Sequence, residues 1–337
     1  MNAQICTWKY GCKFAYSITY DEAFEDLLAH ALPIHRRYNI PGHLVAVAGQ
    51  LGQVRHVPSS SYSGKCRHLS GAQMRELIVE GWSVGDHSMT HGDLNVNPIA
   101  EVLESKRVLE NALGQAVNVF HLPGADFSFA PAARYFESAG FLAVFFADDR
   151  VNSNDPDLFG LSRTLVYVRA GQPEFPLYDP FPRVYDPYHR LHEALDCGGW
   201  IVDLTHLVSP EPIALWKDAT PEILDARFNC VRRVGGGWEW ATEPEQVIDY
   251  ILMRRAATLT PIEWGDKHSA WQLKLADVPT PVKSRELSAT LELSAPISNP
   301  SIWIDRQPVA KFDRQDDRNV TWTWLARDGQ RIELRWQ

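Results

Sequence analysis

The chain has 337 residues, of which 45% are hydrophobic and 22% charged, and its formal net charge is −9. These proportions are those of a folded protein of one or two domains, and they exclude global disorder. The acidic balance argues against a nucleic acid partner, because proteins that neutralise phosphates usually present a basic face.

Targeting and redox signals are absent from the sequence itself. No window approaches the ~18 consecutive apolar residues that a membrane helix needs. Met1–Cys12 contains no apolar stretch long enough for a secretory signal. The five cysteines are too scattered for a disulfide framework. We therefore expect no membrane span, reduced thiols and a cytoplasmic location.

From residue 14 to about 262, short apolar runs alternate with amphipathic helical patterns. The first run, Phe14–Thr19, precedes a helical pattern over 21–37 that ends at Pro41-Gly42. Later strands are predicted at 43–48, 82–85, 117–120, 142–146, 161–168 and 200–204. Later helices are predicted after the Ser70–Gln73 capping box and at 98–114, 131–139, 189–196 and 243–256. The alternation predicts a parallel sheet wrapped by helices, either open or closed as a barrel.

The last 70 residues have a different pattern. Apolar side chains alternate with polar ones around Leu287–Leu293, Val320–Trp324 and Ile332–Trp336, and Asp328-Gly329 between the last two runs is typical of a hairpin turn. We expect a boundary near Trp264–His268. The predicted domains are 1–265, which would hold the active site, and 266–337, a small antiparallel, β-sandwich-like accessory domain.

Polar residues follow the predicted strands with unusual regularity. They are Asp21 and Glu22, Asp86, His87 and His91, His121, Asp148 and Asp149, and His206. In a βα-repeat fold the carboxyl ends of the strands meet at one face, where active sites lie. The sequence therefore predicts one shared site. Asp148 and Asp149 would either orient His206 or His121, or cap a turn.

The pair His87 and His91, four residues apart, can present two imidazoles to one metal. A carboxylate from Asp21-Glu22 would complete three protein ligands, leaving an open position for water, as hydrolytic zinc centres require. A second carboxylate could then take the proton of the water, and a histidine from another strand could protonate the leaving group.

These motifs, in this order, resemble the polysaccharide deacetylases of carbohydrate esterase family four, the NodB-homology type. The segment Ser17-Ile18-Thr19-Tyr20-Asp21-Glu22 looks like the opening motif of the family, and Gly85–His91 looks like its histidine metal motif. Phe120–Gly124 stands where the family has an arginine- and proline-rich motif. Leu204-Thr205-His206 resembles the segment of its final catalytic histidine.

The resemblance implies a deformed (β/α) barrel of about seven parallel strands. It also implies one divalent metal, commonly zinc, with cobalt, nickel or manganese as alternatives. The implied reaction is removal of an N- or O-linked acetyl group from a sugar or glycan. Carried over by position, Asp21 is the general base, His206 the general acid, and Glu22, His87 and His91 the metal ligands. The backbone N–H near Gly124 would help hold the oxyanion.

Two positions depart from the family pattern. Glu22 replaces the second aspartate, so that either Asp21 or Glu22 could be the ligand. His121 replaces the arginine that contacts the base. The alternative functions are hydrolysis of a small acyl-amide or cyclic imide, and an inactive, glycan-binding member. Whether the chain forms a homo-oligomer is left open.

Overall fold

The computed structural model describes residues 2–57, 60–125, 130–169, 184–293, 299–309, 313–314 and 319–336. The chain forms two compact units. The larger is Phe14–Glu245, and the smaller combines Met1–Lys13 with Gln246–Gln337. Within the described ranges, no helix has both the length and the apolar character needed to cross a membrane.

The larger unit is built on a parallel sheet with the strand order β6-β5-β4-β3-β2-β8-β7, and β9 pairs with β2 outside this order. Every residue of the central strand β2 is buried, as expected for a parallel sheet covered on both faces. The strands are β2 (Phe14–Asp21), β3 (His43–Ala46), β4 (Ser83–Asp86), β5 (Val119–His121), β6 (Ala143–Phe145), β7 (Thr164–Leu165), β8 (Trp200–Thr205) and β9 (Glu239–Ala241).

Strands β6 and β7 are the two edges of this sheet, and the segment just before β7 connects them. Phe145 of β6 forms a parallel bridge with Leu161. The Phe146 N–H donates to the Leu161 carbonyl at 2.7 Å, and the Leu161 N–H donates to Val144 at 3.1 Å. The segment then pairs with β8 through Thr164 and Leu165. The sheet thus closes as a deformed barrel of seven parallel strands, as the sequence predicts.

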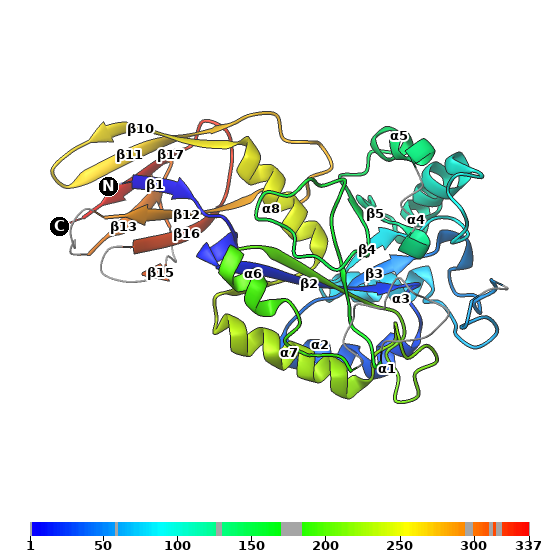
Figure 1. The fold of residues 1–337 in the computed structure, drawn as a ribbon. Helices are drawn as coiled ribbons and strands as arrows, with labels where there is room; N and C mark the ends of the chain where they lie inside the picture. Colours follow the sequence, from blue (N-terminus) through cyan, green and yellow to red (C-terminus); the bar gives the residue numbers. More distant parts are fainter. Residues whose placement is uncertain are drawn as a thin grey trace. The chain divides into compact units, whose positions relative to one another are not determined.

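Helices surround the sheet, and α2 lies beside α7 along one side of it (Figure 1). The helices are α1 (Asp26–His30), α2 (Leu32–Tyr38), α3 (Gly71–Val79), α4 (Ser105–Leu113), α5 (Ala130–Ser138), α6 (Leu191–Cys197) and α7 (Pro221–Gly235). Shorter helical turns of this unit are η2 (Ala48–Gln50), η3 (Ile99–Glu104) and η4 (Pro123–Ala125), whereas η1 (Lys9–Gly11) belongs to the smaller unit. The predicted Ser70–Gln73 capping box is present at the start of α3.

Two helical segments of this unit differ from those predicted. The single helix predicted over 21–37 is two short helices, because Glu22 and Ala23 adopt left-handed turns and the chain breaks again at Ala31. Helix α7 was not predicted at all. Its signals were present, since Thr220 caps it, Pro221 occupies its first turn and Gly236 ends it in a left-handed conformation.

The smaller unit consists of α8 and two antiparallel sheets. One has the order β1-β12-β16-β15 and the other β10-β11-β17-β13-β14. Their elements are α8 (Pro244–Ala256), β1 (Asn2–Ile5), β10 (Ala257–Trp264), β11 (His268–Leu275), β12 (Glu286–Glu292), β13 (Ser301–Ile304), β14 (Gln307–Pro308), β15 (Asp313–Arg314), β16 (Asn319–Leu325) and β17 (Arg331–Arg335).

Two features of this unit differ from expectation. The predicted division at residue 265 falls inside the β10–β11 pair, and the N-terminal strand β1 belongs to this unit because it pairs with β12. The predicted hairpin at Asp328-Gly329 is wrong, since β16 and β17 lie in different sheets. The Gly329 N–H donates to Leu273, and Asp328 accepts from the Leu275 N–H, so that the turn is bound to β11.

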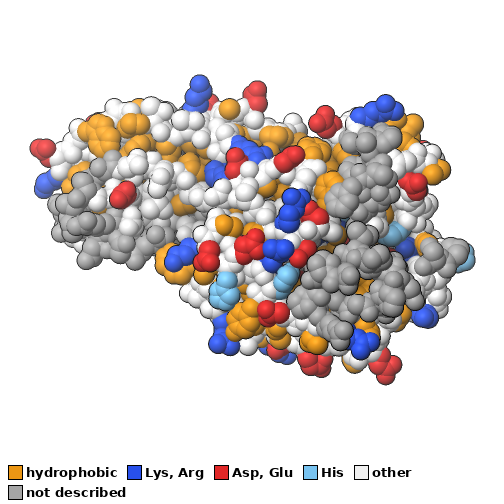
Figure 2. All heavy atoms as spheres, in the orientation of Figure 1, with side chains coloured by type: hydrophobic (Ala, Val, Ile, Leu, Met, Phe, Trp, Pro, Cys, Tyr) orange, Lys and Arg blue, Asp and Glu red, His pale blue; other side chains and the backbone are white. Residues whose placement is uncertain are grey.

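Figure 2 shows basic and acidic side chains interspersed over the face that it draws. Among the residues drawn in colour on this face, no large field of one sign is visible.

Candidate active site

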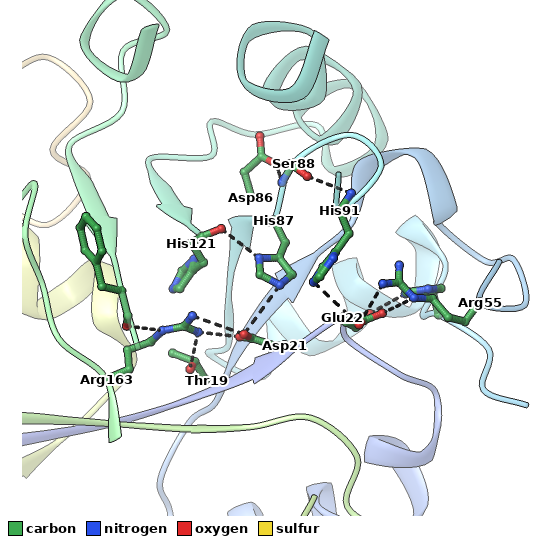
Figure 3. Close-up of polar contacts among 12 residues, drawn as sticks. Thr19, Asp21, Glu22, Arg55, Asp86, His87, Ser88, His91, His121 and Arg163 are labelled. Atoms are coloured by element: carbon green, nitrogen blue, oxygen red, sulfur yellow. Dashed lines mark hydrogen bonds and ion pairs between the residues drawn. The ribbon is translucent and has the colours of Figure 1, made fainter. Parts of the chain in front are cut away.

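Strand β2 delivers two consecutive carboxylates to one place. Asp21 is its last residue, and Glu22 and Ala23 follow with left-handed backbones, at φ 69° and 48°. Such a conformation costs of order 1–3 kcal/mol outside glycine. It is held here because the Glu22 carbonyl accepts from His68 Nδ1 at 2.6 Å and Ala23 accepts from the Leu69 N–H at 2.9 Å. The turn brings both carboxylates towards the same histidine pair (Figure 3).

Asp21 is bound by a buried arginine that the sequence analysis did not single out. Arg163 Nη1 donates to Asp21 Oδ1 at 2.5 Å, and Nη2 donates to Oδ2 at 3.3 Å. The guanidinium also contacts Thr19 Oγ1 and the Phe146 carbonyl, at 3.2 and 3.1 Å. The side chains of Arg163 and Asp21 are 1% and 6% exposed. The carboxylate is therefore fixed in orientation and paired with a permanent cation.

Glu22 has an arginine of its own. Arg55 Nη2 donates to Glu22 Oε1 at 3.0 Å, and Nε lies 2.6 Å from Oε2, with both side chains almost fully buried. Burial raises the pKa of the Glu22 carboxyl to about 7, although Arg55 acts in the opposite direction. Burial also lowers the pKa of Arg55. For the Glu22 carboxyl, the effect of burial on the pKa is therefore larger than the opposing effect of Arg55. A further cation beside Glu22 would lower this pKa and favour the ionised carboxylate.

The loop after β4 presents His87 and His91 to these carboxylates. His87 Nε2 lies 3.7 Å from Asp21 Oδ2, and His91 Nε2 lies 4.0 Å from Glu22 Oε1. The two imidazole rings are edge to face with centroids 4.8 Å apart. Burial lowers the pKa of His87 to about 3 and that of His91 well below its usual value. Both rings are therefore neutral near pH 7, the form in which a ring nitrogen can bind a metal.

Buried hydrogen bonds fix the shape of this loop. His87 Nδ1 donates to the His121 carbonyl at 2.9 Å, which leaves Nε2 as the lone-pair nitrogen facing Asp21. Asp86 accepts from the Ser88 N–H at 2.9 Å, and Ser88 Oγ accepts from the His91 N–H at 2.9 Å. A carbonyl that holds the second nitrogen of a metal-binding histidine is a common arrangement in proteins.

His206 follows β8, as predicted. Its backbone N–H donates to the Lys217 carbonyl at 3.1 Å, and its ring stacks on Tyr62, with centroids 6.0 Å apart and planes inclined by 24°. Part of the residue remains exposed, yet its imidazole is surrounded by protein, and desolvation lowers its pKa well below the usual value. His206 is therefore neutral in the free protein near pH 7.

The other predicted residues lie differently. The His121 imidazole is fully buried and stacks on Phe145 at 4.7 Å, and among the described residues neither ring nitrogen has a hydrogen-bond partner. Gly124 is exposed, with φ at 67°. The Asp148 carboxylate binds Arg150 through Nε at 2.7 Å, so that its ion pair is not with either histidine it was expected to orient.

The donor atoms around Asp21, Glu22, His87 and His91 suit a divalent ion. Within the described parts of the chain, no three histidine, cysteine or carboxylate side chains are grouped as closely as the ligands of a bound ion. Two ligand atoms of one zinc lie roughly 3.3 Å apart, and the distances of 3.7 and 4.0 Å exceed this only slightly. His87 Nε2 is buried without a hydrogen-bond partner among the described residues, and it faces a carboxylate. The chemistry of the set therefore fits the expected metal.

Two functional arginines escaped sequence reasoning. Arg163 is the charged residue within the predicted strand 161–168, and a charge at a buried strand position needs a partner, so this signal was available. Arg55 lies in the long connection between β3 and α3, and no local pattern marks it. Both bind the carboxylates that the sequence analysis did identify.

Comparison with known proteins points to one family. Residues 10–144 match the family model described as polysaccharide deacetylase. The chain is 22% identical over 153 residues to "Putative polysaccharide deacetylase YxkH" of Bacillus subtilis (strain 168). The aligned region covers 44% of this chain and 50% of that protein. The chain thus spans about half the length of this curated relative.

Solved structures of the same kind are also similar. A structure described as "putative polysaccharide deacetylase from Mycobacterium smegmatis" matches over 78% of this chain and 99% of its own, at 15% identity and a TM-score of 0.44. The Streptococcus pyogenes deacetylase PplD matches over 44% of this chain and 62% of its own length, at 21% identity and a TM-score of 0.37. The region that matches the polysaccharide deacetylase model, residues 10–144, contains both the carboxylate pair and the histidine loop.

Proposed function

We propose that the chain is a metal-dependent hydrolase that removes an N- or O-linked acetyl group from a carbohydrate. The observation that carries the proposal is the meeting of Asp21 and Glu22 with His87 and His91. Three of these side chains suffice for a catalytic metal centre, and the fourth remains to act as a base. The larger unit would be the catalytic domain and the smaller one an accessory domain.

Glu22, His87 and His91 would hold one divalent metal, with zinc as the first choice and cobalt, nickel or manganese as alternatives. Such an ion polarises the acetyl carbonyl and lowers the pKa of its water towards ~7. The neutral imidazoles and the buried, only partly compensated Glu22 carboxyl support this set of ligands.

Asp21 would take the proton of the attacking water. Arg163 supports this role because it binds both carboxylate oxygens and so fixes their orientation. His121 contributes through its carbonyl, which positions His87, and thus does not replace the family arginine. Arg163, in the chain just before β7, would supply that contact.

His206 would donate a proton to the departing amine or alcohol. Because its surroundings favour the neutral imidazole, it must receive that proton during the reaction, and the proton that leaves the water is the available source. The exposed backbone N–H of Gly124 would stabilise the oxyanion. Asp148, which binds Arg150, has no part in this scheme.

The test is acetate release from an N-acetylated chitooligosaccharide and from an O-acetylated xylan. The protein is stripped with a chelator and then reloaded with zinc, cobalt, nickel or manganese. The expected result is no activity after stripping and recovery with at least one ion, whereas His87→Ala recovers none. If the stripped protein releases acetate at the full rate, the proposal fails.

A further inference from the structure

Lys217 places an ammonium group beside His206. Its Nζ lies 4.4 Å from the ring centroid of Tyr62 and 5.0 Å from that of Trp216. Tyr62 in turn stacks on the His206 imidazole. The Lys217 carbonyl accepts from the His206 N–H and from Thr205 Oγ1, each at 3.1 Å. Cation–π contacts and backbone bonds therefore fix this cation relative to the predicted acid.

The other cations of the site have carboxylate partners, but Lys217 has none among the residues that the structure describes. Arg163 binds Asp21, and Arg55 binds Glu22. Across the described residues, no carboxylate oxygen is within ion-pair distance of Lys217 Nζ.

The adjacent carboxylate, that of Asp218, is engaged elsewhere. It accepts from the Tyr62 hydroxyl and from the backbone N–H groups of Leu207, Ile213 and Ala214. Lys217 is thus a half-buried ammonium that has given up part of its hydration without gaining an ion pair in the described structure.

The charge of Lys217 acts directly on the candidate site. It lowers the pKa of His206 and of His87, and it acts to lower that of Glu22. Burial lowers the pKa of Lys217 itself, while Glu22, Asp218 and Asp21 act in the opposite direction. The chain as a whole is acidic, with a net charge of −9, so that an unpaired cation at this position is not part of a general basic surface.

We propose that Lys217 binds a carboxylate on the substrate, so that the preferred substrate is an acidic acetylated sugar. Trp216 and Tyr62 flank the ammonium and limit where that carboxylate can lie. The inference rests on the proposed function for its reaction, although binding of the acid depends only on Lys217.

The probes are N-acetylmuramic acid and its methyl ester, which differ in one negative charge. For the metal-loaded wild type we expect kcat/KM for the acid to exceed that for the ester by about tenfold or more, mainly through a lower KM. Lys217→Met should remove this preference, with a larger loss of kcat/KM on the acid than on the ester, and Lys217→Arg should keep most of it. Equal kcat/KM for acid and ester in the wild type, or equal losses on both in Lys217→Met, would overturn the inference.

Calorimetric binding of muramic acid and its methyl ester, which carry no acetyl group on nitrogen, separates this inference from the reaction. Tighter binding of the acid that is lost in Lys217→Met supports the inference even if no substrate releases acetate. Acetate release together with equal binding of acid and ester would leave the hydrolase proposal standing and refute the role of Lys217.

Discussion

Arg163 binds both carboxylate oxygens of Asp21, with its Nη1 2.5 Å from Oδ1 and its Nη2 3.3 Å from Oδ2. The arginine comes from the chain just before β7, which is separated from β2 by β8 in the sheet. A side chain two strands away thus orientates the proposed base, while the residue at the expected arginine position, His121, packs its ring against Phe145.

The first prediction concerns Arg163→Met. It should lower kcat by about 10²-fold or more, because an unorientated base contributes little to proton transfer. It should also reduce the free energy of unfolding by about 3–5 kcal/mol, since it leaves a buried carboxylate unpaired. Arg163→Lys, which restores a charge without the planar fork, should recover part of both.

The diagnostic measurement for Arg163 is the separate effect on kcat and on KM, together with metal content. Without the arginine, kcat should fall while KM and the bound metal, about one ion per chain, stay near the wild-type values. An unchanged kcat in a folded, metal-loaded variant would show that Arg163 does not position Asp21.

The second prediction concerns Gly85, which precedes the histidine loop. A Cβ there would lie 2.6 Å from His121 Cε1 and 2.6 Å from His43 Nε2, so that these rings would have to shift. Gly85→Ala should cost about 1–3 kcal/mol of stability and weaken metal binding, because the His121 carbonyl positions His87. Gly160→Ala is the control, since its Cβ would make only ordinary contacts, the nearest at 3.6 Å. Equal metal affinity in the two variants would contradict the account.

The third prediction concerns pH and His35. This ring is fully buried, with Nδ1 donating to the Ile40 carbonyl and Nε2 accepting from the Tyr20 hydroxyl, each at 2.6 Å. Burial lowers the pKa of His35 from 6.5 to about 3. Between these values only the unfolded chain binds the proton, so stability falls as the pH falls from 6.5 towards 3.

This group alone should contribute a slope of up to about 1.4 kcal/mol per pH unit. Urea unfolding at pH 7, 6 and 5 measures the total slope. In His35→Gln the slope should be smaller by the contribution of about one proton. An identical slope in that variant would refute the conclusion that His35 stays neutral in the folded chain.

Much of the larger unit was predictable because buried parallel strands leave continuous apolar runs between helix caps. The strand ends also located Asp21, Glu22, His87, His91 and His206, since position along a strand determines which residues reach the common face. Contacts made across the sheet were not predictable in this way. Arg163 and Arg55 are far from Asp21 and Glu22 in sequence, and only the closed barrel and the folded connection bring them together.

The hairpin predicted at Asp328-Gly329 failed for a related reason. The local turn signal was strong, but strands β16 and β17 each have an alternating apolar face that packs in a different sheet. Turn residues specify that the chain reverses, and they do not specify which strand becomes the neighbour. The choice depends on β11 and β12, which come earlier in the chain and are the strands with which β17 and β16 pair.

The fourth prediction separates the roles of the two carboxylates. If Glu22 is the metal ligand and Asp21 the base, Asp21→Asn keeps the metal and loses rate by about 10²–10⁴-fold, whereas Glu22→Gln loses the metal. Metal analysis of the two variants side by side decides between them. The reverse pattern would assign the metal to Asp21 and the base to Glu22.

The most direct test of the central claim is made on His87→Ala, with metal content and acetate release measured on the same preparation. The imidazole is fully buried, so thermal unfolding of the variant must first show that the fold persists. The account predicts about one divalent ion per chain and acetate release in the wild type, and loss of both in His87→Ala. Full metal content and full activity in a folded His87→Ala protein would contradict it.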